Sequence, residues 1–333
     1  MRKPKGILIY AVGVVGCGVT RICGDRGYPV RAAVNRPGAK IGRKLSELAG
    51  CALAPDPIVR ASLDEALADG PVDMALFSVS DGLAENMPVY RDLLRRGISV
   101  ISCGLQASYP KVVSQELALE LDTVARRHGA VFYGTGFQDS FRMWLPTVLS
   151  ASANRMTRVT NRSLVDIAPH GPGAAQLGGA GLSADEFRTA MSRYGGITPY
   201  QVLIHQGVET MGLSVESVTS TIEPVFAETP FRRGAFDIPA GKTLGSRTLT
   251  KIVAKGGVEA IAINDLRLAQ DGEDDYVEWE IEGPSPLKCR LTGYDAGLAT
   301  VAQMANRIPD VLAASPGLKS AADLGPARFR GGA

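Results

Sequence analysis

The sequence predicts an α/β protein: a Rossmann-type, doubly wound parallel sheet, followed by an α+β domain with a largely antiparallel sheet. Three observations support this prediction. Buried strand patterns alternate with helical patterns up to about Tyr133. Small or polar residues follow each of these strands, as is typical of ligand-binding strand ends. Between Val215 and Thr292, strand patterns succeed one another without intervening helices.

The first strand leads into a turn rich in small residues. Residues 6–16 read Gly-Ile-Leu-Ile-Tyr-Ala-Val-Gly-Val-Val-Gly, which indicates a strand, a turn and the start of a helix. The usual dinucleotide-binding fingerprint is G-x-G-x-x-G, and Ala11 takes the place of its first glycine. Backbone N–H groups at such a turn favour a pyrophosphate. We therefore expect cofactor contacts from Ala11, Gly13, Val14 and Val15.

The second strand, residues 30–34, ends at Asn35-Arg36. An enzyme that prefers NAD usually places an acidic residue here for the ribose hydroxyl. Asn35 carries no charge, and Arg36 can pair with a 2′-phosphate, with Lys40 and Arg43 close by in the sequence. The pattern favours NADP(H), with NAD(H) as the alternative. Arg36 is also compatible with an ordinary solvated turn.

Three more strands are expected at residues 74–79, 98–102 and 130–133, with helices at 15–26, 62–68, 86–96 and 115–127. The carboxyl ends of parallel strands lie along one edge of a sheet, where ligands bind. The residues expected to contact the cofactor at these ends are Ser78, Val79, Ser80, Cys103, Gly104, Thr135 and Gly136.

The second half of the sequence lacks the regular alternation of strand and helix patterns. We expect a helix at 141–151, a strand at 158–165, a loop at 167–181 around His170, and helices beginning near Ser183 and Thr198. Strands follow at 215–226, 248–254, 258–268, 277–282 and 287–292, then a helix at 297–314 and an extended tail. The expected domains are 1–135 for the dinucleotide, 136–296 for substrate and dimerisation, and 297–333 returning to the first domain.

Composition limits the class of protein. The net charge of +2 gives no field that would favour nucleic acid or a membrane surface. Five cysteines are widely spaced without a C-x-x-C pair, so we expect free thiols, no metal site and a cytoplasmic location. The basic N-terminus before an apolar run resembles a signal peptide, but the run holds ordered glycines and continues into a strand pattern.

Several segments together resemble a known family. They are residues 11–16 (AVGVVG), 40–50 (KIGRKLSELAG), 100–102 with Tyr109-Pro110, 134–136 (GTG), 221–224 (TIEP) and 299–309 (ATVAQMANRIP). They resemble the dihydrodipicolinate reductase superfamily, and within it the group of 2,4-diaminopentanoate dehydrogenases and native amine dehydrogenases. The resemblance implies an NAD(P)-dependent enzyme that reduces an imine to an amine or oxidises the amine. It also implies a homodimer formed through the open face of the second domain's sheet.

Two departures from the group's pattern affect the chemistry. The group has a pair of glutamates after Ile-Ser, one of which handles the amine proton, and this chain has Leu105-Gln106. Gln106 can form hydrogen bonds but cannot exchange a proton near neutral pH. The group's G-T-G-x-N-P-G-F is here G-T-G-F-Q-D-S-F, which introduces Asp139. These changes favour a preformed imine over direct amination of a ketone.

The expected catalytic residues are Asp139, Tyr109, Gln106 and His170. Asp139 is compatible with acid–base chemistry, with binding a cationic substrate, or with a helix cap. Tyr109 lies near the nicotinamide by the resemblance, or packs as a loop aromatic. His170 lies in a Gly/Pro-rich loop or on the surface.

The substrate is expected to be a small imine, amine or related carbonyl compound. Two alternatives remain open: a reductase of another C=N or C=C bond on the same scaffold, and a dinucleotide-binding sensor without catalysis.

Overall fold

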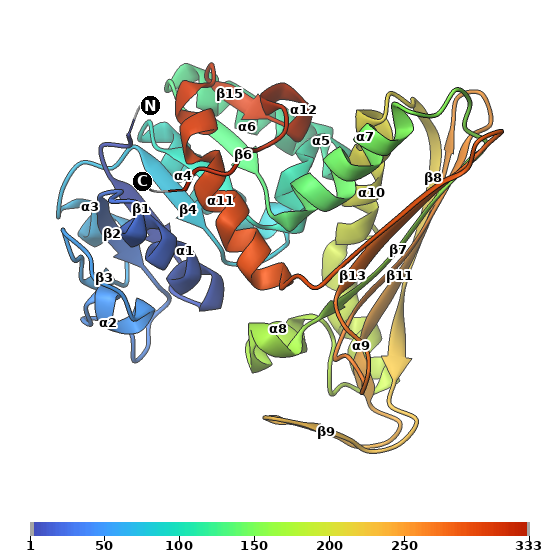
Figure 1. Ribbon diagram of the computed structural model, residues 1–333. Helices are drawn as coiled ribbons and strands as arrows, with labels where there is room; N and C mark the ends of the chain where they lie inside the picture. The colour runs from blue at the N-terminus through green and yellow to red at the C-terminus, as the bar shows by residue number, and fades with distance from the viewer. Residues whose placement is uncertain (1–2, 332–333) are drawn as a thin grey trace. The chain divides into compact units, whose positions relative to one another are not determined.

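The computed structural model describes residues 3–331, apart from the side chains of His170, Ala174 and Leu177. The chain forms two compact units (Figure 1). Unit 1 contains the chain up to Asp139 and again from Leu298, and unit 2 is Ser140–Gly297. The predicted α/β class is confirmed, because a parallel sheet with helices forms unit 1 and a separate, mostly antiparallel sheet forms unit 2.

Unit 1 is organised around a parallel sheet that has seven strands among the described residues. In spatial order these are β3 (Val59–Arg60), β2 (Val30–Val34), β1 (Ile7–Tyr10), β4 (Met74–Phe77), β5 (Ser99–Ser102), β6 (Val131–Gly134) and β15 (Gly317–Lys319). The chain runs outward from β1 in one direction and then returns to β4 on the other side. Dinucleotides bind at such a reversal, at the carboxyl ends of the strands.

Helices cover both faces of this sheet because successive strand side chains point to opposite sides. Ile7 and Ile9 of β1 belong to an apolar cluster with Val19 of α1 and Met304 of α11, whereas Leu8 belongs to a second cluster with α4 and α6. The helices of unit 1 are α1 (Val14–Asp25), α2 (Leu45–Ala49), α3 (Leu63–Leu67), α4 (Leu83–Arg95), the 3-10 helix η1 (Leu105–Ser108), α5 (Pro110–Val113), α6 (Gln115–Arg127), α11 (Ala296–Ala313) and α12 (Ala321–Leu324).

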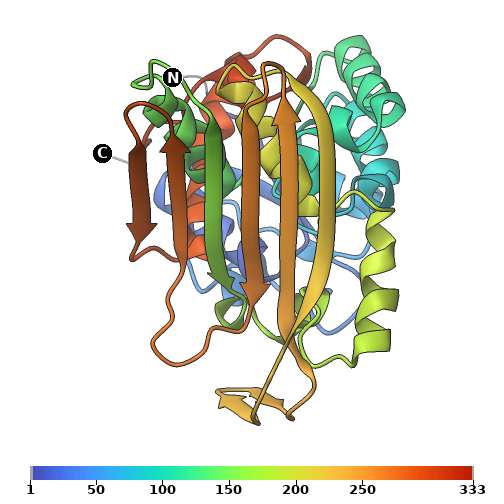
Figure 2. The same ribbon diagram turned by 90° about the vertical axis from the view of Figure 1, so that its right-hand side faces the viewer.

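Unit 2 contains a mixed sheet, shown face-on in Figure 2. Its order is β14 (Leu287–Thr292), β13 (Tyr276–Glu282), β7 (Arg158–Asp166), β12 (Glu259–Arg267), β11 (Thr243–Ala254) and β8 (Val215–Phe226). Only the pairing of β7 with β12 is parallel among these described strands. A short hairpin, β9 (Phe231–Arg233) and β10 (Phe236–Ile238), extends from β8 and β11.

Helices α7 (Leu145–Ser150) and α10 (Pro199–Thr210) contact one face of this sheet. Figure 2 shows the opposite face toward the viewer, with no helix drawn in front of it. The remaining helical segments are the π-helix η2 (Asp139–Trp144), η3 (Ala168–His170), α8 (Pro172–Leu177), α9 (Ala184–Met191) and η4 (Ser192–Tyr194).

Two local predictions were wrong. The segment expected to be a loop at 167–181 contains η3 and α8, and the tail expected to be extended over 321–330 begins with α12. The short strand β15 precedes that tail and was not predicted. Gly317 N–H donates to Ala130 O at 3.0 Å, so β15 lies beside β6. No local sequence pattern indicates this pairing. Ser320 and Asp323 then form a capping box that starts α12.

Candidate active site

The turn between β1 and α1 has the shape that a pyrophosphate requires. Ala11 adopts a φ of 79°, a left-handed conformation that glycine usually provides. A Cβ added to Gly16 would lie 2.0 Å from Ala11 O, whereas one added to Gly13 would meet no heavy atom within 4 Å. The N-terminus of α1 carries no side-chain cap and no acidic residue in its first turn. The turn therefore leaves backbone N–H groups and open space for an anion.

Asn35, at the end of β2, supports this turn. Its Oδ1 accepts a hydrogen bond from Val12 N–H at 3.1 Å, and its Nδ2 donates to Arg36 O at 3.0 Å. Lys40 Nζ donates to Val12 O, so an ammonium lies beside the same turn. Arg36 is exposed, whereas Arg43 is paired with Glu47 at 3.7 Å. Asn35 and Lys40 therefore hold the backbone of the turn at Val12, and Arg36 follows on the exposed side of the strand end.

The ends of β4 and β5 lie next to the turn. Ser78 N–H donates to Tyr10 O at 3.1 Å, and Ser78 Oγ donates to Ala11 O at 3.3 Å. Val79 is 44% exposed, which is high for valine. A Cβ on Gly104 would lie 2.7 Å from Ser80 O, so only glycine allows the two loops to approach. Burial raises the pKa of the nearby Cys103 thiol to about 12, so it stays protonated at neutral pH.

The side chain of Gln106 binds the N-terminus of α4. Its side chain is almost fully buried, and Oε1 accepts from Leu83 N–H at 2.9 Å, at the first residue of that helix. Gln106 N–H donates to Asp81 O at 3.2 Å, and Leu105 N–H donates to Asp81 Oδ1 at 3.1 Å. These bonds fix the loop after β5 against the loop after β4.

Tyr109 follows η1 and is half-buried. Lys111 Nζ lies 4.4 Å from the centroid of the Tyr109 ring. A cation in this position is attracted to the aromatic face. The structure therefore pairs a phenol with an ammonium close to the carboxyl end of β5.

Asp139 lies at the centre of a buried polar network. Its side chain has 0% exposure, and Oδ2 accepts from Tyr133 Oη, from Thr135 Oγ1 at 2.8 Å and from Arg307 Nη2 at 3.4 Å. Burial raises the pKa of Asp139, while Arg307 and the hydroxyl donors oppose that change. Burial, together with the negative charge of Asp139, also raises the pKa of Tyr133. The network fixes the loop of Gly134–Gly136 to α11.

Sequence reasoning missed Arg307 and Lys111. An arginine within the apolar pattern of 299–309 is a signal for a buried charge, but it does not identify the partner. Asp139 does not serve as the expected helix cap in the hydrogen bonds described for it, since its carboxylate accepts from side chains. The structure brings Asp139 together with Thr135, another predicted residue, and places Gln106 and Tyr109 on the neighbouring loop.

His170, the remaining predicted catalytic residue, belongs to unit 2. His170 ends η3, and its side chain lies outside the described part of the chain. Arg142 is fully buried, donates from Nη2 to Ser163 Oγ at 3.0 Å and lies 4.9 Å from the ring centre of Tyr200. Arg142 therefore supports the packing of η2 against the sheet of unit 2.

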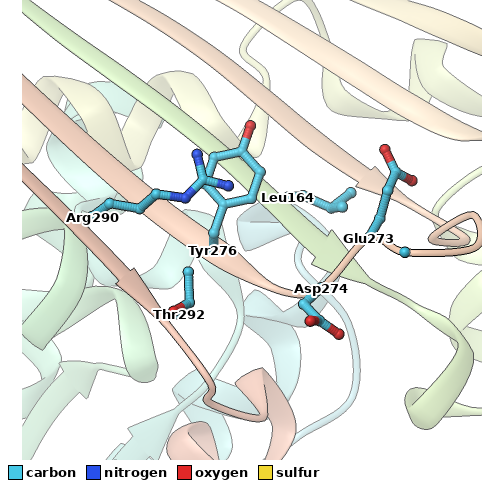
Figure 3. A pocket seen from close by; sticks show the side chains of 7 residues that line it. Leu164, Glu273, Asp274, Tyr276, Arg290 and Thr292 are labelled. Atoms are coloured by element: carbon cyan, nitrogen blue, oxygen red, sulfur yellow. The ribbon is translucent and has the colours of Figure 1, made fainter.

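A hollow of about 350 Å³ also lies in unit 2, at the ends of β7, β13 and β14 (Figure 3). Arg290 stacks on Tyr276, with its guanidinium carbon 3.8 Å from the ring centre. None of the predicted site residues lines this hollow.

No helix within residues 3–331 is long and apolar enough to cross a membrane. The same residues contain no group of three or more His, Cys, Asp or Glu side chains placed to hold a metal ion.

Comparison with known proteins gives concordant results. The family model of the 2,4-diaminopentanoate dehydrogenase C-terminal domain matches residues 142–329. The 2,4-diaminopentanoate dehydrogenase of Acetoanaerobium sticklandii is 21% identical over 97% of this chain and 94% of its own length. The structure of an amine dehydrogenase from Mycobacterium smegmatis is similar with a TM-score of 0.91 and 27% identity, covering 98% of both chains. GenD2 from gentamicin A biosynthesis, solved in complex with NAD, shares the fold at a TM-score of 0.54 and 17% identity, over 87% of this chain and 73% of its own.

Proposed function

Because the chain belongs to the 2,4-diaminopentanoate dehydrogenase C-terminal domain family, we propose that it reduces an imine to an amine with NADPH, or oxidises the amine in reverse. At the level of class, the chain is an oxidoreductase of the amine dehydrogenase type with a dinucleotide-binding fold. The observation that carries the proposal is the turn between β1 and α1, which is open at Gly13 and closely packed at Gly16.

The dinucleotide supplies the hydride, and the protein positions both partners and provides a proton. In this proposal the pyrophosphate is held by Ala11, Gly13, Val14 and Val15 at the α1 N-terminus. The residues proposed to contact the rest of the cofactor are Asn35, Arg36, Ser78, Val79, Ser80, Cys103, Gly104, Thr135 and Gly136.

The preference for NADPH rests on Asn35, Arg36 and Lys40. Arg36 is exposed and Lys40 already contacts the turn, so a 2′-phosphate would meet two positive charges. A carboxylate at position 35 would repel that phosphate, and Asn35 removes this repulsion. NAD(H) is the alternative cofactor.

The preference for a preformed imine rests on Gln106. In the resemblance a glutamate near this position handles the amine proton, and Gln106 instead accepts a hydrogen bond from Leu83 N–H. Condensing ammonia with a ketone requires several proton transfers, which an amide side chain does not provide. Asp139 is buried against Arg307, which favours a role in ordering the Gly134–Gly136 loop. His170 remains a candidate for substrate contact.

We also propose a homodimer formed through the open face of the sheet in unit 2. Register places Leu249 opposite Ile263, so apolar side chains share that face at its centre. Arg162 beside Glu278 and Lys251 beside Glu259 form ion pairs around it. An apolar centre with a polar rim is typical of a protein interface.

The test is to monitor oxidation of NADPH with a panel of cyclic and acyclic imines, separately with the matching ketones plus ammonia, and separately with substrates that carry an activated C=C bond. Turnover of imines, with little or none from ketone and ammonia, is the expected result. NADPH binding without turnover of any panel member would favour the alternative of a dinucleotide-binding sensor. Two observations support that alternative: Gln106 cannot exchange a proton near neutral pH, and Asp139 is buried. Turnover of only C=C substrates would favour a different reductase.

A further inference from the structure

We propose that the Glu85 carboxylate accepts hydrogen bonds from the two hydroxyls of the ribose that carries the nicotinamide. This inference rests on the dinucleotide site of the proposed function and adds a binding residue to it. Glu85 lies in the first turn of α4, just after the loop that follows β4. An acidic residue is favoured in any first helical turn, so the sequence alone does not distinguish a ligand contact from ordinary helix stabilisation at this position.

The end of β4 is where the second ribose of a dinucleotide is expected. β1 leads into the turn proposed for the pyrophosphate, and its neighbours in the sheet are β2 and β4. The adenosine ribose lies at the end of the strand on one side, which here is β2. Neighbouring strands lie about 4.8 Å apart, a separation comparable to the size of a sugar ring. The ribose on the other side of the pyrophosphate therefore falls at the end of β4.

The loop after β4 is attached directly to the pyrophosphate turn. Ser78 N–H donates to Tyr10 O at 3.1 Å, and Ser78 Oγ donates to Ala11 O at 3.3 Å. Val79 is exposed and Ser80 is half-buried, so the chain continues from the turn into a surface that a ligand can reach.

The Glu85 carboxylate is held over this loop. Its Oε2 accepts a hydrogen bond from Ser80 Oγ at 2.9 Å. A Cβ added to Gly82 would lie 3.2 Å from the same oxygen, so the carboxylate lies close above the backbone at Gly82. The Glu85 side chain is exposed, which leaves the carboxylate accessible to a ligand. The N-terminus of α4 favours a negative charge at this place.

Asn86 arranges the loop before any ligand binds. Its side chain is 4% exposed, and Nδ2 donates to Gly82 O at 2.8 Å and to Ser80 Oγ at 3.1 Å. A serine hydroxyl has one proton to donate, and with Asn86 as donor that proton is directed to Glu85. The carboxylate is thus positioned by a buried amide through Ser80. Such preorganisation lowers the cost of ordering the site on binding.

The chemistry of the second ribose suits a carboxylate. Its two adjacent hydroxyls are donors, and an ionised carboxylate offers two acceptor oxygens. Hydrogen bonds to a charged acceptor are stronger than those between neutral groups. This ribose carries no phosphate in NADPH or in NADH, so a carboxylate at the end of β4 does not repel it. The end of β2 differs, because a carboxylate there would repel the 2′-phosphate of NADPH.

The experiment measures Kd by equilibrium titration of three ligands of increasing length. The first, 2′-phospho-ADP, ends at the pyrophosphate; 2′-phospho-ADP-ribose adds the second ribose, and NADPH adds the nicotinamide. Glu85→Gln keeps an acceptor for Ser80 Oγ and removes the charge. It should weaken binding of the second and third ligands about tenfold and leave the first within about twofold of wild type. ADP, ADP-ribose and NADH form the corresponding series without the 2′-phosphate.

Glu65→Gln is the matched control, because Glu65 is exposed and lies in the first turn of α3. It should leave all three affinities unchanged. Unchanged binding of 2′-phospho-ADP-ribose by Glu85→Gln overturns the inference, and so does a loss confined to NADPH, which would place the contact at the nicotinamide. Equal losses for all three ligands also overturn it, since they would indicate a structural change in α4. A wild-type chain that binds NADPH but reduces no imine overturns the proposed reaction instead, and the ligand series still tests Glu85.

Discussion

Arg307 Nη2 of α11 lies 3.4 Å from Asp139 Oδ2, and neither side chain has any exposed surface. The two residues are 168 positions apart in the sequence. A buried ion pair is destabilising when one partner is removed, because the other charge is left without compensation. This pair therefore makes α11 a necessary part of unit 1.

Arg307→Met should destabilise the fold by about 3–5 kcal/mol at neutral pH. Burial already raises the pKa of Asp139, and loss of Arg307 raises it further. A carboxyl group whose pKa is higher in the folded than in the unfolded state stabilises the fold at pH values below its unfolded-state pKa. That stabilisation is lost as the pH rises through the folded-state pKa. The cost of Arg307→Met should therefore be smaller near pH 4 than near pH 8 in urea unfolding.

The control for this pair is Arg126→Met, which removes an exposed partner of Asp122 and should cost less than about 1 kcal/mol. The double variant Asp139→Asn with Arg307→Met should recover part of the loss. A pH-independent cost for Arg307→Met would contradict the assigned role of the Asp139 charge.

Gly13→Ala and Gly16→Ala should separate binding from folding. The Cβ at position 16 would collide with Ala11 O, so this variant should unfold at markedly lower denaturant concentration. The Cβ at position 13 meets nothing in the protein, so its stability should stay within about 1 kcal/mol of wild type. Its Kd for NADPH should rise about tenfold or more, since the methyl group occupies the space proposed for the pyrophosphate. Unchanged NADPH binding by Gly13→Ala would argue against the turn as the cofactor site.

Arg36→Ala should reduce the preference for NADPH over NADH about tenfold, which corresponds to about 1.4 kcal/mol for a charge-assisted contact to phosphate. The affinity for NADH should change little. Arg43→Ala is the matched control, because Arg43 is paired with Glu47. Equilibrium titration with both cofactors measures the preference directly, and equal losses for both cofactors would contradict a contact with the 2′-phosphate.

Gln106→Glu should introduce activity with a ketone and ammonia. The glutamate can still accept from Leu83 N–H at the start of α4, where a negative charge is favourable. Gln106→Ala should instead lose about 1 kcal/mol of stability without gaining activity. Amine formation measured by chromatography, together with NADPH oxidation, tests the prediction. Wild-type turnover of ketone and ammonia at a rate equal to that of Gln106→Glu would contradict it.

Ile263→Lys should disrupt the proposed dimer. The residue lies opposite Leu249 on the open face of the sheet, and a lysine there adds a positive charge beside Arg162. Light scattering after size-exclusion chromatography should report a monomer for this variant and a dimer for wild type. Leu119→Lys is a suitable control, because Leu119 is exposed on α6 of unit 1. A wild-type monomer at all concentrations would exclude the proposed interface.

The dinucleotide fold was predictable from sequence because its signals are local. The buried strands, the small residues at their ends and the Ala11–Gly16 turn each follow from a few adjacent residues. The likeness to the 2,4-diaminopentanoate dehydrogenase group, expected from short motifs, is confirmed by the family match. The short β3 and β15 were missed because two or three residues carry no periodic pattern, and each strand forms only beside an existing sheet edge.

The role of Asp139 could not be predicted in the same way. A carboxyl group after a strand is compatible with a cap, a catalyst or an ion pair, and the choice depends on what packs against it. Arg307 arrives from the far end of the sequence, and only folding brings its guanidinium to the carboxylate. The same holds for Gln106, whose side chain accepts a hydrogen bond from Leu83 N–H and so joins η1 to the start of α4.

The sequence alone thus determined the long strands and helices of both units, the small-residue turn after the first strand, the basic residues that follow the second strand and the glutamine at position 106. These are properties of short segments, where backbone preference and side-chain chemistry act between neighbours. The tertiary structure decided which polar groups are compensated, because hydrogen bonding and desolvation depend on residues that are distant in sequence. It placed Asp139 against Arg307 and, within the loop at the end of β5, placed the Lys111 ammonium against the Tyr109 ring.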